Sequence, residues 1–212
     1  MKITSLRQYK GTTYEAELDD NRKIYLHIDI VADFGLYCGM ELERDTLRKI
    51  IYASNFRRAY QYALYSLDYR DYSYSEMYKK LEKTYKNEKL CFAVMERLVN
   101  FGFINDRRYA EKLARKYVET KHFGLRRAKT EMYAKGLPFD IIDEALEEFE
   151  ELTEENLAYL LEKKYARLLE DRDDRKTIEK VKSALVRYGY GFSDINRAVA
   201  DYFESIDSQE DY

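Results

Sequence analysis

The chain has 212 residues, 45% of them apolar and 36% charged, with a single proline, Pro138, and eight glycines. This composition excludes a disordered chain, which would be less apolar, and a fold of many short strands, which would need more turn-forming residues. A mainly helical protein is therefore expected, either as one compact domain or as a row of smaller units. The net charge of -3 excludes a surface built throughout to neutralise phosphate, but it allows a local basic face.

Cysteine usage and hydropathy indicate the cellular compartment. The only cysteines, Cys38 and Cys91, form neither a disulfide framework nor a metal-binding spacing, and both are expected to be buried thiols in a reducing compartment. The first residues lack the apolar segment of a secretory signal, and no apolar run is long enough to span a bilayer. We therefore expect a soluble, cytoplasmic protein without a membrane partner.

The first 53 residues are predicted to form a small module of their own. Apolar and polar residues alternate on both sides of the turn at Asp19–Arg22, which predicts an antiparallel sheet from Lys2 to about Asp29. A short connector follows at 36–42. Asp45 is then expected to cap a helix that carries Leu47 and two isoleucines on one side.

From Ser54 onward the pattern is helical, and the chain repeats itself. The stretches KGLPFDIIDEALEEF and YGYGFSDINRAVADY superpose Gly136 on Gly189 and Phe139 on Phe192, an offset of 53 residues. A looser copy lies 51 residues earlier, where Tyr85 aligns with Gly136. The sequence therefore predicts three tandem units of three helices each.

We predict these three-helix repeats at 54–104, 105–152 and 153–205, after the module at 1–53 and before an acidic tail at 206–212. The expected helices lie near 54–68, 73–84 and 88–100, near 106–120, 124–136 and 140–150, and near 153–169, 174–188 and 193–204. Because three short helices bury little core alone, the repeats should pack end to end into an elongated array. The predicted fold is thus mainly α, with a small N-terminal antiparallel β module. The tail is short, terminal and polar, and is expected to be disordered.

The stretch LVNFGFINDRRYA, from Leu98 to Ala110, predicts a junction between two helices. Gly102 can take the left-handed conformation that ends one helix, and Asn105 can cap the next. Arg107 and Arg108 then fall in the first turn, where the positive end of the helix dipole disfavours each cation by about 0.3–1 kcal/mol. Helix formation alone does not account for these two arginines.

The same predicted helix has one apolar side and one basic side. Its apolar side comprises Tyr109, Ala110, Leu113, Ala114, Tyr117 and Val118, and its basic side comprises Arg108, Lys112, Arg115 and Lys116. Residues 105–135 contain ten basic and four acidic side chains, whereas residues 138–157 contain nine acidic side chains and no basic one. This division fits either a solvated helix face balanced by a neighbouring acidic arc or a surface that meets a polyanion or an acidic partner. Charge alone does not decide between them.

The sequence contains no recognisable catalytic or cofactor motif. His27 and His122 have no cysteine, second histidine or carboxylate pair at ligand spacing, so each is expected to be an ordinary polar residue. Phosphate-binding loops, dinucleotide-binding glycine patterns and nucleophile elbows are also missing from the sequence. We therefore expect a binding protein and not an enzyme, with no metal and no cofactor.

Three stretches in chain order resemble the RecX family of recombinase regulators. They are RDYSYSEMYKKL, VMERLVNFGFINDRRYAEKLA and FGLRRAKTEMYAKGLPFDIIDEAL. The residues that fill the family pattern are Arg70, Ser73, Glu76, Met77, Lys80 and Leu81, then Leu98, Gly102, Asp106, Tyr109 and Ala110, then Gly124, Arg127, Ala128, Met132 and Gly136. The resemblance covers about 56–149 well and the third repeat more loosely.

The resemblance implies a monomeric helical protein that lies in the groove of the RecA filament on single-stranded DNA and inhibits its recombinase and ATPase activities. It implies the RecA nucleoprotein filament as partner, with single-stranded DNA as a possible direct contact. The surface facing that partner is then expected to contain Arg70, Lys79, Lys80, Arg107, Arg108, Lys112, Arg115, Lys116, Arg126 and Arg127. The alternatives are a sequence-independent DNA-binding helical protein and a helical protein-binding adaptor unrelated to RecA.

Overall fold

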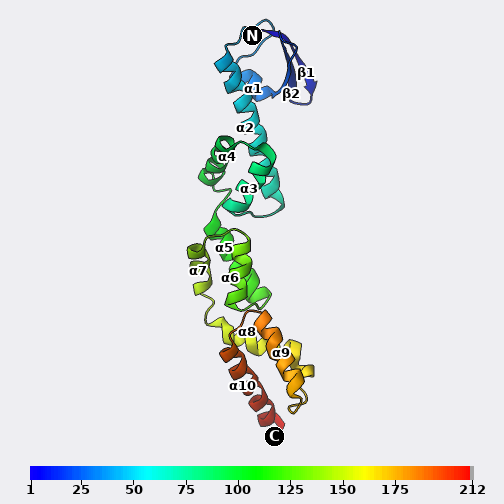
Figure 1. Ribbon diagram of the computed structural model, residues 1–212, viewed down its shortest axis with the longest axis vertical. Helices are drawn as coiled ribbons and strands as arrows, with labels where there is room; N and C mark the ends of the chain where they lie inside the picture. The colour runs from blue at the N-terminus through cyan, green and yellow to red at the C-terminus, as the bar shows by residue number, and fades with distance from the viewer. Residues whose placement is uncertain (211–212) are drawn as a thin grey trace. The chain divides into compact units, whose positions relative to one another are not determined.

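The computed structural model describes residues 1–210, with side chains described to Asp207 (Figure 1). Its contacts divide the chain into two compact units, which are described separately below. The first unit contains Met1–Arg70 and Met77–Phe103, and the second contains Asp71–Glu76 and the chain from Ile104 onward. Helices dominate both units, and the only sheet within the described residues is a small antiparallel one near the N-terminus, so the predicted fold class is confirmed.

The first unit begins with the predicted sheet. Strands β1 (Ile3–Lys10), β2 (Thr13–Leu18) and β3 (Lys23–His27) pair antiparallel in the order β1-β2-β3. Asn21 takes a left-handed conformation with φ 63° in the predicted turn. Helix α1 (Ile28–Asp33), which was not predicted, follows directly and is capped by His27, whose Nδ1 accepts from the Asp29 amide at 3.2 Å. The sheet and this helix enclose a core of Ile3, Ala16, Leu18, Leu26, Ile30, Leu36, Leu42, Leu47 and Ile50.

Helix α2 (Arg44–Tyr69) corrects the prediction of two separate helices on either side of residue 53. No glycine or proline interrupts this stretch, so the two helical patterns fuse into one helix of 26 residues. Glu43 is the N-cap residue, and the predicted cap Asp45 lies in the first turn instead. The carboxylate of Asp45 still favours helix formation there because it faces the positive end of the helix dipole.

The remaining helices of the first repeat are α3 (Tyr74–Tyr85) and α4 (Glu88–Asn100). Asn87 caps α4 by accepting from the Leu90 amide at 3.1 Å. The helix ends as predicted, because Gly102 has φ 70° and the amides of Gly102 and Phe103 return to the Val99 and Leu98 carbonyls. Cys91 is buried on α4, but Cys38 is exposed and its thiol donates to the Thr4 carbonyl, so the prediction that both thiols are buried was wrong for Cys38. Cys38 lies in the loop before the β-bridge residue Glu41, and its neighbours Tyr37 and Gly39 are exposed as well.

The second unit contains the second and third repeats. The second repeat comprises α5 (Asp106–Arg115), the π-helical turn η1 (Lys116–Thr120), α6 (Leu125–Ala134) and α7 (Phe139–Glu147). The third comprises α8 (Leu152–Leu160), the turns η2 (Leu161–Tyr165) and η3 (Ala166–Leu168), α9 (Arg175–Arg187) and α10 (Phe192–Glu210). Each repeat has its own apolar cluster, centred on Leu113, Met132 and Ile142 in the second and on Leu161, Leu185 and Ile195 in the third.

Backbone contacts join the repeats of the second unit at the aligned glycines. Gly136 and Gly189 both have positive φ, 76° and 97°, where their middle helices end. The Gly124 amide at the start of α6 donates to the Tyr188 carbonyl at 2.8 Å. In the corresponding place before α3, the Ser73 hydroxyl donates to the Lys135 carbonyl at 2.6 Å. The middle helices of the first and second repeats, α3 and α6, therefore begin against the end of the middle helix in the following repeat.

The prediction of a disordered tail after residue 205 was wrong for the described part, because α10 continues to Glu210. Residues 211–212 lie outside the described residues. The helix continues because Tyr202, Phe203 and Ile206 are partly buried on one side and Asp207 pairs with Arg172 at 2.5 Å. No helix between residues 1 and 210 combines the length and the apolar character needed to cross a bilayer.

Candidate functional site

Helix α5 carries the predicted basic face, and its start is held by two side chains. Asn105 accepts from the Arg108 amide at 3.0 Å, as predicted for the cap. The Asp106 carboxylate accepts from the Tyr74 amide at 2.8 Å. Burial raises the pKa of Asp106 above its ordinary value, although the hydrogen bond from Tyr74 acts in the opposite direction. This N-terminus is therefore fixed by contacts on both of its sides.

The two sides of α5 and η1 differ in burial as the helical wheel predicted. All six predicted apolar residues are buried, from Tyr109 to Val118. The four side chains Arg108, Lys112, Arg115 and Lys116 are exposed on the opposite side. We call these four residues the α5 stripe. Their position follows from the helix period, because a cation can remain solvated only on the side that does not pack.

Acidic side chains border the α5 stripe at two places. Arg107, beside the stripe, pairs with Glu144 of α7 at 2.8 Å, and Lys112 pairs with Asp71 at 2.9 Å. Both pairs are exposed and therefore contribute little to stability, about 0–1 kcal/mol each. Arg115 and Lys116 take part in no ion pair with the side chains described to Asp207. Carboxylates of α7 and of the segment before α3 thus pair with cations in the first two turns of α5, and the cations without an ion pair lie at its C-terminal end.

Arg126 and Arg127 are neighbours in the sequence but have different surroundings. Arg127 is partly buried, with its Cζ 3.9 Å from the centre of the Phe123 ring and its Nη1 3.2 Å from the Arg187 carbonyl oxygen, to which it donates. Its Nε also lies 3.6 Å from Glu131. Arg126 is exposed and extends from the first turn of α6. Arg127 therefore joins the second and third repeats, and Arg126 is available to solvent.

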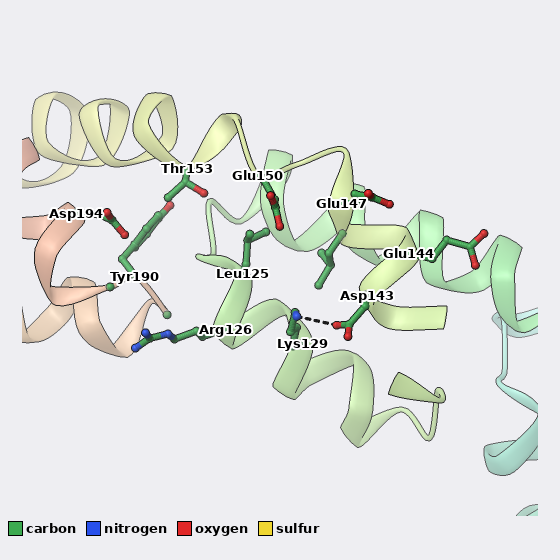
Figure 2. Close-up of a pocket in the computed structure, with 13 residues that line it drawn as sticks. Leu125, Arg126, Lys129, Asp143, Glu144, Glu147, Glu150, Thr153, Tyr190 and Asp194 are labelled. Carbon is green, nitrogen blue, oxygen red and sulfur yellow. Dashed lines mark ion pairs between the residues drawn. The ribbon is translucent and has the colours of Figure 1, made fainter. Parts of the chain in front are cut away.

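A cleft of about 660 Å³ opens between the second and third repeats (Figure 2). Arg126 and Lys129 of α6 line one side, carboxylates of α7 line another, and Tyr190 and Asp194 come from the third repeat. The Lys129 side chain points at Asp143, with Nζ 2.6 Å from Oδ1, whereas Arg126 extends away from that pair toward the segment that carries Tyr190. The cleft is therefore lined by both basic and acidic side chains, and the ion pair between Lys129 and Asp143 occupies part of it.

A buried polar network beside this junction was not predicted. The Asn156 side chain lies 2.6 Å from His122 Nδ1 and donates to the Val118 carbonyl at 3.2 Å. The Tyr190 hydroxyl donates to the His122 carbonyl at 2.9 Å, and burial raises the pKa of Tyr190 far above its ordinary value. His122 is therefore a partly buried polar residue, as expected. Among the described side chains, no cluster of three or more His, Cys, Asp or Glu residues could hold a metal ion.

The remaining predicted site residues belong to the first unit. Arg70 is exposed at the C-terminal end of α2, and Lys79 is exposed on α3. Lys80 is partly buried, with its Nζ 5.3 Å from the centre of the Tyr62 ring. The predicted basic surface is thus divided between the two units. Arg107, Arg127 and the α5 stripe lie in the second unit together with Arg126.

Comparisons with known proteins agree on one family. The family models described as the second and third three-helix domains of RecX match residues 105–146 and 151–199. The chain is 28% identical over 200 residues to the regulatory protein RecX of Clostridioides difficile strain 630, and the match covers 93% of each chain. It is 28% identical over 213 residues to the regulatory protein RecX of Streptococcus gordonii, covering 100% of this chain and 79% of the relative.

Two solved structures resemble the fold. A crystal structure of a regulatory protein RecX superposes with a TM-score of 0.70 and 25% sequence identity, covering 92% of this chain and 97% of the other. The crystal structure of RecX from Lactobacillus salivarius superposes with a TM-score of 0.64 and 26% identity, covering 71% of this chain and 97% of the other.

Proposed function

Because the chain belongs to the RecX family of regulatory proteins, we propose that it binds the RecA filament on single-stranded DNA and inhibits the recombinase and its ATP hydrolysis. The protein acts by binding as a monomer and catalyses no reaction of its own. The observation that supports this function best is the α5 stripe. It is a row of exposed cations on a well-capped helix, and its last two members, Arg115 and Lys116, form no ion pair with the described side chains.

The position of the arginines in α5 favours a role in binding over a role in folding. Arg107 and Arg108 follow Asp106 in the first turn, where the helix dipole makes each cation unfavourable by about 0.3–1 kcal/mol. A polyanionic partner offsets this cost, because its phosphates add negative charge beside the two arginines at the helix N-terminus. The same contact releases counterions from the nucleic acid, so binding through this helix should weaken as salt increases.

The acidic side chains nearby determine how the stripe can approach a nucleoprotein filament. Glu144, Glu147 and Glu148 line a second cleft between α5 and α7, together with Arg107 and Arg115. These carboxylates repel DNA phosphates when α7 is turned toward the nucleic acid. The charge arrangement therefore favours one orientation, with the stripe toward DNA and α7 toward the protein subunits.

Direct binding to single-stranded DNA without RecA is the second candidate function. The exposed side chains of Arg115 and Lys116 favour it, because they have no ion-pair partner among the described side chains and could contact phosphates directly. A helical adaptor that binds neither DNA nor RecA is the remaining alternative.

Co-sedimentation separates these three functions. The protein is sedimented with RecA on single-stranded DNA, with single-stranded DNA alone, and with RecA alone, and RecA-driven ATP hydrolysis is measured in parallel. We expect retention on the RecA filament and inhibition of ATP hydrolysis. Equal retention on naked DNA would assign the DNA-binding function, and no retention on either would assign the adaptor.

A charge-reversal variant tests the surface itself. Arg108→Glu, Arg115→Glu and Lys116→Glu together should abolish inhibition while leaving thermal unfolding nearly unchanged, since all three side chains are exposed. The matched control reverses Lys163, Lys176 and Lys180, three exposed cations of the third repeat, and changes the net charge by the same amount. Inhibition retained by the stripe variant, or lost equally in both variants, would exclude the stripe as the contact surface.

A further inference from the structure

A groove of about 340 Å³ lies between α8 and α10 in the third repeat, apart from every predicted site residue. The two helices pack against each other (Figure 1). Apolar atoms of Leu157, Ala158, Ala198 and Tyr202 line the groove, and the small side chains of the two alanines leave it open. Leu157 is buried beneath the groove, whereas Ala158 is exposed and Ala198 and Tyr202 are partly buried, so these three residues form the apolar floor that solvent reaches.

Carboxylates surround this apolar surface. Five acidic residues line the groove, and Arg197 is the one cation among its lining residues. Arg197 is already paired with Glu154 at 2.5 Å and with Asp194 at 3.6 Å. The three acidic residues of the groove that do not pair with Arg197 are Glu155, Glu162 and Asp201. They are exposed and form no ion pair with any side chain described to Asp207.

Two features indicate what the groove can hold. The pair between Arg197 and Glu154 shows that a guanidinium already binds at the rim, supplied by the chain itself. The phenol of Tyr202 has a raised pKa, first because of burial and then because of the negative charges of Glu162 and Glu170. The groove is therefore a region of negative potential with an apolar floor, and it complements a ligand that has cations beside an apolar group.

We propose that this groove docks a basic, amphipathic segment of a partner protein, with an apolar side chain against Ala158, Ala198 and Tyr202 and with Lys or Arg side chains at Glu155, Glu162 and Asp201. Nucleic acid does not fit, because the rim carboxylates repel phosphates. A second copy of this chain does not fit through its own basic helix, because the apolar side of α5 is buried in the core of the second repeat. Through α5 a second copy would offer only cations, and the apolar floor would stay uncovered.

This docking surface is independent of the proposed function. It lies on α8 and α10, whereas the α5 stripe lies in the second repeat, so the two surfaces can be altered separately. A protein with both surfaces can hold a polyanion through one and a basic protein segment through the other. Loss of the groove should leave binding to naked single-stranded DNA unchanged.

The test uses a fluorescein-labelled synthetic helical peptide with leucines on one face and lysines and arginines on the other, and the full chain as its binder. The groove variant combines Glu155→Gln, Glu162→Gln and Asp201→Asn, which keep side-chain size. The control variant combines Asp140→Asn, Glu148→Gln and Glu151→Gln, three exposed carboxylates outside the groove. Fluorescence anisotropy should show a fall in affinity of about tenfold or more for the groove variant and a change within about twofold for the control.

A second peptide tests the apolar floor. It has the same charge, but serines replace the leucines, and it should bind the wild-type chain about tenfold more weakly than the amphipathic peptide. The proposal is overturned by any of four results: no binding of the amphipathic peptide, equal loss in the groove and control variants, equal binding of the two peptides, or self-association of the wild type that the groove variant lacks. The last result would assign the groove to a second copy of the chain.

Discussion

Gly124 and Gly189 lie against each other so closely that neither position has room for a side chain. A Cβ atom on Gly124 would lie 2.5 Å from the Gly189 carbonyl carbon, and a Cβ on Gly189 would lie 2.5 Å from the Arg127 amide nitrogen. The second and third repeats therefore meet through backbone atoms, which cannot move aside as flexible side chains do. The packing between these two repeats depends on both glycines.

Replacing Gly189 by alanine should be unusually destabilising. Alanine would have to adopt the left-handed conformation at φ 97°, and its Cβ would also clash with the backbone of Arg127. The free energy of unfolding should therefore fall by about 3 kcal/mol or more. Gly39 provides a matched control, because its φ is 95° and no atom lies within 4 Å of the added Cβ. Gly39→Ala should cost only about 1–2 kcal/mol in urea unfolding. Equal losses in the two variants would show that the close approach of the backbones has no energetic role.

Asp106 should make stability depend on pH in an unusual direction for a carboxylate. Burial raises its pKa, so the folded protein binds this proton more tightly than the unfolded chain does. The contribution of Asp106 to stability is therefore largest below the ordinary carboxyl pKa and falls as pH rises through the raised value. Asp106→Asn keeps an acceptor for the Tyr74 amide and removes the buried charge. As pH rises through that interval, the free energy of urea unfolding should fall for the wild type relative to Asp106→Asn. A difference that stays constant with pH would contradict this account.

Asp106→Ala separates the hydrogen bond from the charge. The variant leaves the Tyr74 amide without its acceptor, which should cost about 1–3 kcal/mol relative to Asp106→Asn at neutral pH. Chemical denaturation of the two variants measures the difference directly. Equal stability of the two would mean that water replaces the carboxylate at no cost.

Arg127 should behave as a structural residue and Arg126 as a surface residue. Arg127→Ala removes the stacking on Phe123 and the hydrogen bond to the Arg187 carbonyl, and should lower the free energy of unfolding by about 1–3 kcal/mol. Arg126→Ala should change it by no more than about 0.5 kcal/mol, because the side chain is exposed. Thermal unfolding of both variants checks this order. A larger loss in Arg126→Ala would reverse the assignment.

Removing the Tyr190 hydroxyl should weaken the junction between the second and third repeats. Tyr190→Phe keeps the buried ring but leaves the His122 carbonyl without its donor, at a cost of about 0.5–1.5 kcal/mol. Tyr188→Phe is the control, since the Tyr188 ring lies beside Arg127 and its hydroxyl contacts the exposed Lys164. Unfolding monitored by near-ultraviolet circular dichroism should show the larger loss for Tyr190→Phe. Wild-type stability in Tyr190→Phe would indicate that the hydrogen bond is dispensable.

Signals that act within a few residues allowed much of the fold to be predicted. Asn105 caps α5 and Gly102 ends α4 because both need only local backbone geometry. The alignment of Gly136 with Gly189 predicted that the second and third repeats correspond, and the two glycines do lie at equivalent places, each with positive φ after the middle helix. The period of apolar residues in α5 predicted which of its cations would be exposed.

Features that depend on distant partners could not be predicted in this way. Arg127 follows Arg126 in a basic run, and only the Phe123 ring and the end of α9 distinguish their surroundings. The two patterns on either side of residue 53 were predicted as separate helices because Leu47 packs in the core of the N-terminal sheet, whereas Ala59 is buried farther along the same helix. The helical end of α10 depends on Arg172, which lies 35 residues before its partner Asp207.

The contacts at the repeat junctions have a fixed direction along the chain: donors at the start of one middle helix meet acceptors at the end of the next. Carbonyl groups at the end of α9 accept hydrogen bonds from the amide of Gly124 and the guanidinium of Arg127. The carbonyl after α6 accepts one from the hydroxyl of Ser73. Within the described residues, the N-terminus of α9 has no such neighbour: its acceptor is the Asp174 carboxylate of the same helix cap, which accepts from the Thr177 amide at 3.0 Å. The repeats are consequently not interchangeable: exchanging the order of the second and third would bring together two surfaces that lack their matching donors and acceptors.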